Sequence, residues 1–201
     1  MIKNIGIIDY GCGNIHSLSC ALKNIGCNVS IISNDLKNKN LNGIFIPGVG
    51  SFDNAMNKIK KKNLDQVIYE YFKNDNLIVG ICLGMQVLVD TGVENSITEG
   101  LKLIRGETYK LKFKKDEKNI NIGWNKTYFT NENFKQFDKE KFYYVHSYAV
   151  ETDQNLSCCY STFNNNKFIS GLINQNIYAF QFHPEKSGNV GLDLLKEVIK
   201  N

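Results

Sequence analysis

The sequence contains no hydrophobic run as long as the roughly 20 residues of a membrane-spanning helix, so we expect no membrane protein. It has no C-x-x-C pair and no histidine at metal-ligand spacing from a cysteine, and we therefore expect neither a metal site nor another cofactor. Its first residues lack the basic region and cleavage site of a secretory signal. Together with six cysteines that suit a reducing compartment, this predicts a cytoplasmic protein.

Proline is scarce, with two in 201 residues, and no proline- or serine-rich linker, low-complexity segment or internal repeat divides the chain. A chain of this length can bury one continuous core. Its content of 42% hydrophobic and 22% charged residues is typical of a globular protein. We therefore predict a single domain that spans residues 1–201.

The net charge is small, at +4, and has two main sources, lysine clusters at Lys58–Lys62 and Lys110–Lys118. A basic patch can bind the phosphates of nucleic acid. No set of aromatic residues that could stack on several bases accompanies these lysines. We interpret both clusters as solvated surface and predict no nucleic-acid partner.

The first half of the chain alternates short apolar segments with helical patterns. Parallel strands that are covered on both faces have this continuous apolar character, and helices connect them. A glycine turn, Gly11-Cys12-Gly13, separates the first strand from a helix that begins near Asn14 and ends near Ile25. We predict strands at Lys3–Asp9, Val29–Ser33, Gly43–Ile46 and Leu77–Ile81, and helices that begin at Ser51 or Asp53, span Leu64–Lys73 and follow Cys82.

In the second half, strand patterns dominate and are separated by Asn, Gly and Asp turns. Their alternation of apolar and polar residues predicts antiparallel additions to the sheet. The expected fold is therefore an α/β fold with a central, mostly parallel sheet and antiparallel strands in its C-terminal half. We predict strands at Thr108–Phe113, Ile120–Phe129, Phe142–Val150, Ser157–Phe163, Lys167–Asn174 and Ile177–Phe182, and a last helix at Val190–Lys200.

One cysteine has the surroundings of a catalytic nucleophile. Gly80-Ile81-Cys82-Leu83-Gly84 follows an apolar strand and precedes a helical pattern. A strand–turn–helix of this kind holds a nucleophile on a sharp turn, and small flanking residues avoid clashes there. A helix N-terminus also stabilises a thiolate. We predict that Cys82 is a nucleophile rather than a core residue.

A cysteine nucleophile needs a base, and the base needs an orienting group. His183 and Glu185 follow the last apolar strand in Phe182-His183-Pro184-Glu185, so both should project from one strand end. Glu185 can accept a hydrogen bond from His183 and fix its tautomer. The alternative is a surface turn with an unrelated carboxylate. The Cys82 motif favours a Cys82–His183–Glu185 triad.

Acyl transfer also requires donors for a developing oxyanion. Pro47-Gly48-Val49-Gly50 ends the third predicted strand, and its glycines allow backbone N–H groups to approach a ligand closely. Both prolines of the chain, Pro47 and Pro184, fall in the candidate active-site turns. We predict that Gly48, Val49 and Gly50 form the oxyanion hole, although an ordinary turn has the same pattern.

These motifs together resemble the class I glutamine amidotransferases, which have a three-layer, flavodoxin-like fold. Within that family, the resemblance is strongest to the glutaminase subunits of imidazole glycerol phosphate synthases. The segments that carry it extend across nearly the whole chain and include the following: Gly80–Gln86, Phe182–Glu185, Ile8–Asn14, Ile46–Phe52, Ile122–Asn125, Val145–Tyr148 and Glu185–Gly188.

The resemblance implies that Cys82 attacks the side-chain amide of L-glutamine, His183 transfers protons and Glu185 orients His183. It further implies that glutamine is held by Gln86 and by the backbone around His146, Ser147 and Tyr148, without catalysis by His146. The ammonia would pass to a cyclase partner, a (β/α)8 barrel in a heterodimer. That partner makes imidazole glycerol phosphate and an aminoimidazole carboxamide ribonucleotide in histidine biosynthesis.

By the same resemblance, the partner interface includes Asn14, Trp124, Tyr143 and Lys186. Trp124 in the core and Lys186 as a solvated lysine are the alternatives. The chain departs from the family at Asn119–Ile122, since the family often has a proline at the position of Asn121, two residues before Gly123. This departure concerns the geometry of the interface loop and leaves the triad unaffected.

Three other functions remain possible at this point. A related amidotransferase could supply ammonia to a sugar-modifying synthase in surface-glycan biosynthesis, with the same triad. A stand-alone cysteine hydrolase would not need Gln86 or the Gly123-Trp124-Asn125 segment. A binding module without catalysis would not need all three triad residues.

Overall fold

The computed structural model describes residues 3–34, 40–113 and 119–200. At the centre of its sheet, five parallel strands lie in the order β2-β1-β3-β4-β13. All five come from apolar segments, as predicted. Their bounds are β1 Asn4–Ile8, β2 Asn28–Ile32, β3 Gly43–Ile46, β4 Leu77–Ile81 and β13 Ile177–Phe180.

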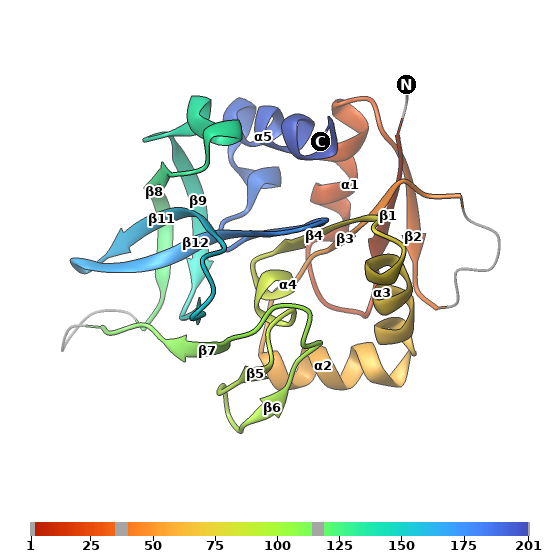
Figure 1. The fold of residues 1–201 in the computed structure, drawn as a ribbon, viewed down its shortest axis with the longest axis horizontal. Helices are drawn as coiled ribbons and strands as arrows, with labels where there is room; N and C mark the ends of the chain where they lie inside the picture. The colour runs from red at the N-terminus through yellow and green to blue at the C-terminus, as the bar shows by residue number, and fades with distance from the viewer. Residues whose placement is uncertain (1–2, 35–39, 114–118, 201) are drawn as a thin grey trace.

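Helices cover both faces of these strands (Figure 1). On one face, α1 (Ile15–Asn24) and α5 (Gly188–Lys200) bury leucines against the strands. On the other, α2 (Phe52–Lys61) and α3 (Leu64–Lys73) bury residues that recur every three or four positions, as an amphipathic helix requires. The result is the three-layer arrangement expected of a doubly covered parallel sheet.

The second half of the chain extends the sheet with antiparallel pairs. The sheet continues from β13 in the order β12-β10-β7-β5-β6, and β11, β8 and β9 branch from β12. The predicted α/β class with antiparallel C-terminal additions is therefore confirmed. The bounds are β5 Thr91–Gly92, β6 Thr98–Glu99, β7 Glu107–Lys110, β8 Asn121–Phe129, β9 Lys141–His146, β10 Tyr148–Glu151, β11 Ser157–Phe163 and β12 Asn166–Asn174.

One local prediction was wrong. The strand predicted at Phe142–Val150 is two strands, because the chain leaves β8 after His146 and pairs with β7 from Tyr148 onward. The helix predicted after Cys82 is present, as a single turn, α4 (Leu83–Gln86). The two-residue strands β5 and β6 and the 3-10 helix η1 (Glu132–Phe137) were not predicted, since such short segments show no periodicity.

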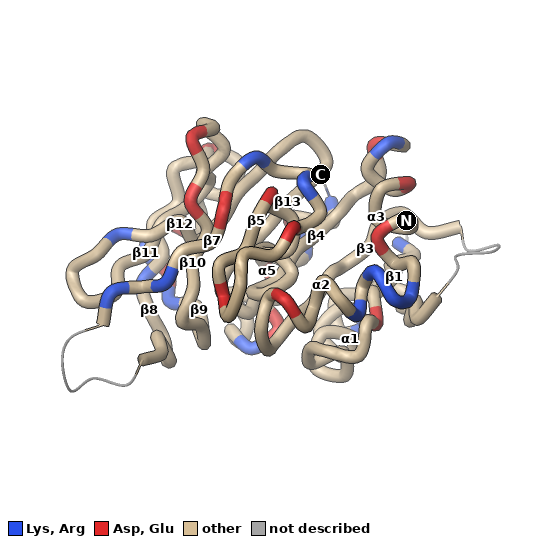
Figure 2. The backbone as a smooth tube through the Cα atoms, turned by 90° about the horizontal axis from the view of Figure 1, so that it is seen from below, with Lys and Arg blue, Asp and Glu red and all other residues tan. Residues whose placement is uncertain are grey.

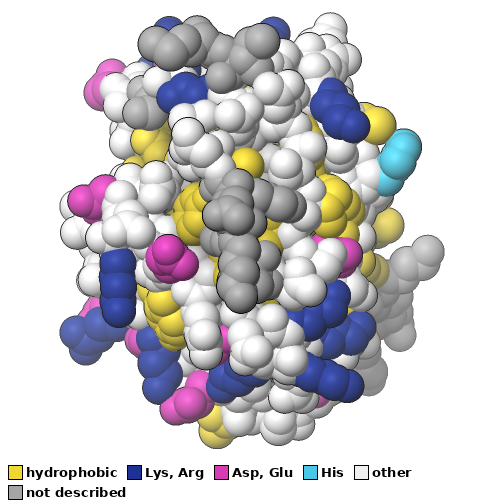
Figure 3. All heavy atoms as spheres, turned by 90° about the vertical axis from the view of Figure 1, so that its right-hand side faces the viewer, with side chains coloured by type: hydrophobic (Ala, Val, Ile, Leu, Met, Phe, Trp, Pro, Cys, Tyr) yellow, Lys and Arg dark blue, Asp and Glu magenta, His cyan; other side chains and the backbone are white. Residues whose placement is uncertain are grey.

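The basic residues lie at the surface, as interpreted from the sequence. Lysines gather where α2 ends, and acidic and uncharged side chains lie between the basic groups (Figures 2 and 3). Most of the second cluster, residues 114–118, is outside the described residues. No helix in the described part of the chain is both long and apolar enough to cross a membrane.

Candidate active site

Cys82 occupies a strained turn between β4 and α4. Its backbone has φ +54° and ψ −110°, a conformation that residues with a side chain rarely adopt. A Cβ on Gly84 would overlap the backbone carbonyl of Ile46 on β3, and one on Gly80 would lie 2.8 Å from the carbonyl oxygen of Gly84. The flanking glycines are therefore required by close packing, which confirms the reason given for them from the sequence.

His183 and Glu185 form a buried pair. His183 Nδ1 lies 2.8 Å from Glu185 Oε1, and the two side chains are only 2% and 3% exposed. The His183 main chain is held by β9, since its N–H donates to the carbonyl of Tyr143 at 2.8 Å. The Ser187 hydroxyl donates to the His183 carbonyl at 2.6 Å and accepts from the Tyr143 N–H at 3.0 Å.

The charge on His183 depends on Cys82. Burial lowers the pKa of the His183 ring, but Cys82 and then Glu185 raise this pKa to about 10. An opposite charge within a few ångströms favours the ionised form of a group in this way. The electrostatics therefore favour an imidazolium at His183, next to Cys82.

Two buried glutamines connect to the Cys82 thiol. Gln181 Nε2 lies 3.7 Å from Cys82 Sγ, and Gln86 Nε2 donates to Gln181 Oε1 at 3.0 Å. The Cys82 thiol in turn faces the carbonyl oxygen of Val145 at 3.7 Å. The sequence did not lead us to assign a role to Gln181. Its position two residues before His183, at the end of the same strand, could have indicated that it lies near the thiol.

A cavity of about 220 Å³ opens above Cys82. Small-molecule sites are commonly a few hundred Å³, so this one suits a compact ligand such as an amino acid. It brings together residues from five separate segments of the chain. Its walls are Val49, Gly50, Cys82, Leu83, Gln86, Glu94, Ile120, Val145, His146, Ser147 and Tyr148.

The predicted glutamine-binding residues all line this cavity, and several already have partners. Gln86 Nε2 also donates to the Tyr148 carbonyl at 2.9 Å. His146 Nδ1 donates to the same carbonyl at 2.8 Å, so its Nε2 accepts from Asn121 Nδ2 at 2.9 Å. Burial lowers the pKa of His146 to about 4, which leaves a neutral ring suited to a structural role. The Ser147 hydroxyl donates to the carbonyl of Asn119 at 2.6 Å.

Asn121, at the position where the family often has proline, is buried and makes hydrogen bonds through its side chain. It is 2% exposed, and besides contacting His146 it accepts a hydrogen bond from Asn125 Nδ2 at 2.8 Å. An asparagine supplies both a donor and an acceptor that proline lacks. In this chain the segment before Gly123 is thus fixed by side-chain hydrogen bonds.

The predicted oxyanion residues divide into two groups. Val49 and Gly50 line the cavity, and Gly50 has φ +112°. Gly48 is packed below them, since a Cβ there would lie 2.5 Å from the Tyr10 hydroxyl and 2.7 Å from Leu83 Cβ. Leu83 begins α4, so its N–H has no acceptor within the helix. The sequence analysis missed this backbone donor, which has no side-chain signature.

Glu94 also lines the cavity and was not predicted from the sequence. Its Oε2 accepts from the N–H of Phe52, the first residue of α2, at 3.0 Å. Burial raises the pKa of this carboxyl group, and the hydrogen bond from Phe52 lowers it. Glu94 thus places a carboxyl group in the wall of the cavity that also contains Cys82. It lies in a loop without a recognisable motif, which is why the sequence did not reveal it.

Three of the four predicted interface residues lie side by side. Trp124 on β8 stands opposite Tyr143 on β9, with ring centroids 6.1 Å apart, and Lys186 Nζ lies 5.9 Å from the Tyr143 ring centroid. Trp124 is 51% exposed, so the alternative of a core tryptophan is wrong. Asn14 caps α1, a helix that contacts the 3-10 helix η2 (Pro184–Lys186), and its side chain accepts from the Ser17 N–H at 3.1 Å.

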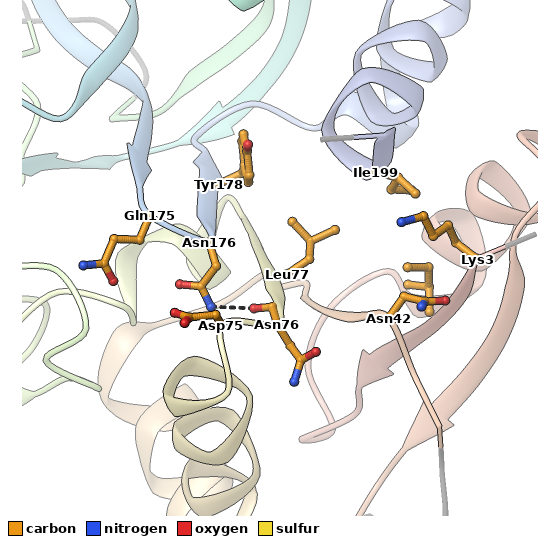
Figure 4. A pocket seen from close by; sticks show the side chains of 10 residues that line it. Lys3, Asn42, Asp75, Asn76, Leu77, Gln175, Asn176, Tyr178 and Ile199 are labelled. Atoms are coloured by element: carbon orange, nitrogen blue, oxygen red, sulfur yellow. Dashed lines mark hydrogen bonds between the residues drawn. The ribbon is translucent and has the colours of Figure 1, made fainter. Parts of the chain in front are cut away.

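A second cavity, of about 230 Å³, lies at the amino ends of the parallel strands (Figure 4). Its walls include Lys3, Asn42, Leu77 and Tyr178, which are near the starts of strands rather than their ends. Ligands of open α/β sheets bind outside the carboxyl ends of the strands. The cavity above Cys82 is therefore the candidate active site.

Comparison with known sequences agrees with this geometry. The sequence profile of the family described as "Glutamine amidotransferase class-I" matches residues 6–200. A protein from Cyanidium caldarium named imidazole glycerol phosphate synthase subunit hisH is 40% identical, with complete coverage of both chains. The protein of the same name from Bacillus subtilis (strain 168) is 34% identical over 98% of this chain and 95% of its own length.

Solved structures support the fold. A structure of PurLQS from Thermotoga maritima matches with a TM-score of 0.79 at 17% identity, over 100% of this chain and 99% of the other. A glutamine amidotransferase from the same organism matches with a TM-score of 0.66 at 16% identity, over 100% and 82%. The chain therefore belongs to the class-I glutamine amidotransferase family and, within it, is a relative of the HisH subunits of imidazole glycerol phosphate synthase.

Proposed function

We propose that this chain hydrolyses L-glutamine to glutamate and ammonia at Cys82, as the glutaminase subunit of an imidazole glycerol phosphate synthase. The observation that carries the proposal is the buried His183–Glu185 pair, 2.8 Å apart, whose imidazole is held protonated by Cys82 on a strained turn. A stored thiolate next to a proton donor is what amide cleavage by cysteine requires.

The reaction would proceed in two halves. The Cys82 thiolate attacks the amide carbon, His183 gives its proton to the leaving nitrogen, and ammonia departs from a glutamyl thioester. His183 then takes a proton from water, the resulting hydroxide attacks the thioester, and the thiolate leaves. Glu185 keeps the ring oriented and stabilises its positive charge throughout.

The oxyanion of each tetrahedral intermediate needs donors from the backbone. We assign this role to the N–H groups of Leu83 and of the Val49–Gly50 turn, which lie in the cavity wall. Because Gly50 adopts a positive φ without a neighbouring obstruction, its peptide can reorient at low steric cost. Loss of one such donor costs about 3 kcal/mol, so reorientation of this turn would regulate turnover.

Substrate recognition would use groups left free in the cavity. Both N–H groups of the Gln86 amide are used by Tyr148 and Gln181, and among the described residues nothing donates to its Oε1. That oxygen and the Glu94 carboxylate can accept hydrogen bonds from the α-ammonium group of glutamine. His146 and Ser147 would shape the cavity through their backbone.

The ammonia acceptor is inferred from the relatives, whose names identify them as synthase subunits. We propose a cyclase partner with a (β/α)8 barrel, a heterodimer, and docking on Trp124, Tyr143 and Lys186, with Asn14 as a further contact. An exposed aromatic pair next to a lysine is typical of a protein interface. These relatives favour this acceptor over a sugar-modifying synthase.

The glutaminase proposal is tested on the complex by assaying product formation from glutamine and from ammonium salts. Cys82→Ala should abolish the first activity and preserve the second, because the partner's chemistry does not use this thiol. Loss of both activities to the same extent would mean that Cys82 is structural. Full-speed glutamine hydrolysis by the isolated chain would instead favour a stand-alone hydrolase.

The partner proposal is tested by co-purification and affinity measurement. Trp124→Ala should weaken association with the cyclase by about 2 kcal/mol or more, as expected of a central aromatic residue. Tyr128→Ala is the matched control, since Tyr128 is also exposed and lies on the same strand, four residues along. Equal effects of the two substitutions would remove Trp124 from the interface.

A further inference from the structure

A cysteine and a lysine outside the active site are in direct contact. Cys12 lies in the glycine turn between β1 and α1, and Lys58 lies in the second half of α2. Lys58 Nζ is 3.1 Å from Cys12 Sγ and 3.3 Å from the carbonyl oxygen of Gly11. The two side chains come from segments 46 residues apart in sequence, so the contact is a product of the tertiary fold.

Neighbouring contacts hold the lysine in place. One helical turn further along α2, Lys62 Nζ donates to the carbonyl of Asp9 at 2.8 Å. Asn54, one turn earlier, approaches Cys12 Sγ to 4.0 Å. The face of α2 that these residues share is thereby fixed against the β1–α1 turn, and Lys58 does not need to move to reach the sulfur.

Accessibility separates Cys12 from the other cysteines. Four of them are buried (Cys27, Cys82, Cys158 and Cys159), whereas Cys12 is partly exposed and Cys20 is exposed. Cys20 has only His16 near its sulfur, at 3.9 Å. Within the described part of the chain, Cys12 is thus the solvent-accessible thiol that has a lysine amine in contact.

We propose that Cys12 and Lys58 form a reversible covalent crosslink when a hydroperoxide oxidises the Cys12 sulfur. In the first step the thiol attacks the peroxide: an S–O bond forms, the O–O bond breaks, and the remaining oxygen leaves as an alcohol, or as water when the oxidant is hydrogen peroxide, while the thiol becomes a sulfenic acid. In the second step the neutral amine of Lys58 attacks the sulfur. An N–S bond forms, the S–O bond breaks, and water leaves with the amine proton.

The observed geometry suits the second step. A separation of 3.1 Å between nitrogen and sulfur lies within the roughly 3–3.5 Å expected of reacting atoms held for attack. Holding two reactants at this distance makes the condensation effectively unimolecular, so it competes with further oxidation of the sulfenic acid by peroxide. A thiol such as the reducing agent dithiothreitol would break the N–S bond and regenerate both side chains.

The test is peroxide treatment of the full chain, followed by trypsin digestion and mass spectrometry. Residues 4–23 form one tryptic peptide that contains both Cys12 and Cys20. We expect this peptide joined to residues 40–60, with Lys58 uncleaved and two hydrogens missing, and released by dithiothreitol. A peroxide-treated chain that carries only sulfinic or sulfonic acid at Cys12, or an unmodified Cys12, would overturn the proposal.

Matched variants assign the bond. Cys12→Ser and Lys58→Arg should abolish the crosslinked peptide; the arginine keeps the positive charge, so the contact with the turn is preserved. Cys20→Ser and Lys60→Arg should leave the crosslinked peptide unchanged. Cys20 lies on α1, away from the turn that carries Cys12, and Lys60 is an exposed residue of α2. A crosslink that survives in Lys58→Arg, or is lost in Cys20→Ser, would contradict the assignment.

Discussion

Replacing Cys82 by serine removes the thiolate that faces His183, and the pKa of the His183 ring should fall. In the native protein burial lowers this pKa, and Cys82 and then Glu185 raise it to about 10. One nearby opposite charge moves a pKa by about 1–3 units, so the variant should titrate lower by about that amount. At 1.36 kcal/mol per unit, the ion pair contributes roughly 1–4 kcal/mol.

The sign of the pH dependence follows from the direction of the shift. Because the pKa is raised, His183 carries its proton at neutral pH and loses it as the pH rises through about 10. The native enzyme should therefore keep its proton donor across the neutral range, and its turnover should fall on the alkaline side. In the serine variant the ring should lose its proton at a lower pH.

The assay is NMR titration of ring-labelled histidine in the native and Cys82→Ser proteins. The chain has only three histidines, and a His16→Gln variant assigns the exposed one. His146 is recognised by its pKa near 4, which burial lowers most and the charge on His183 lowers further. A His183 midpoint that is the same in both proteins would refute the thiolate–imidazolium pair.

Three further predictions concern the same site. Glu185→Gln should reduce turnover less than His183→Ala, because the carboxylate orients the ring whereas the ring transfers the proton. In steady-state kinetics each substitution should lower turnover by a factor within about 10²–10⁴. A reversed order would indicate another base. Gly84→Ala should lower the free energy of unfolding by about 1–3 kcal/mol or more, since its Cβ would overlap the Ile46 carbonyl, and an unchanged thermal midpoint would contradict this. A diazo-ketone analogue of glutamine should label Cys82 alone among the six cysteines, as mapped by mass spectrometry; an adduct mainly at Cys12 would argue against the assigned nucleophile.

The candidate triad residues could be selected from the sequence because their signals are local. Gly80, Cys82 and Gly84 belong to one turn, and His183 and Glu185 are two residues apart at one strand end, so each geometry is fixed within a few residues. The parallel strands were equally predictable, since burial on both faces leaves a continuous apolar run.

Other parts of the site depend on contacts between distant segments. Glu94 reaches the cavity from a loop that is held by the start of α2, and no spacing in the sequence indicates this. Leu83 contributes through its backbone, which any residue would supply. The break at Ser147 arises because β9 and β10 pair with different neighbours, and a continuous strand pattern does not record a change of partner.

The hydroxyl of Ser187 has a consequence for communication between surfaces. It accepts from the Tyr143 backbone and donates to the His183 carbonyl, while the Tyr143 carbonyl accepts from the His183 N–H. The strand that presents Tyr143 to solvent is thus closed in a ring of three hydrogen bonds with the residue that carries the catalytic proton. A partner that docks on Tyr143, as proposed above, would therefore be linked to the His183 backbone without entering the cavity.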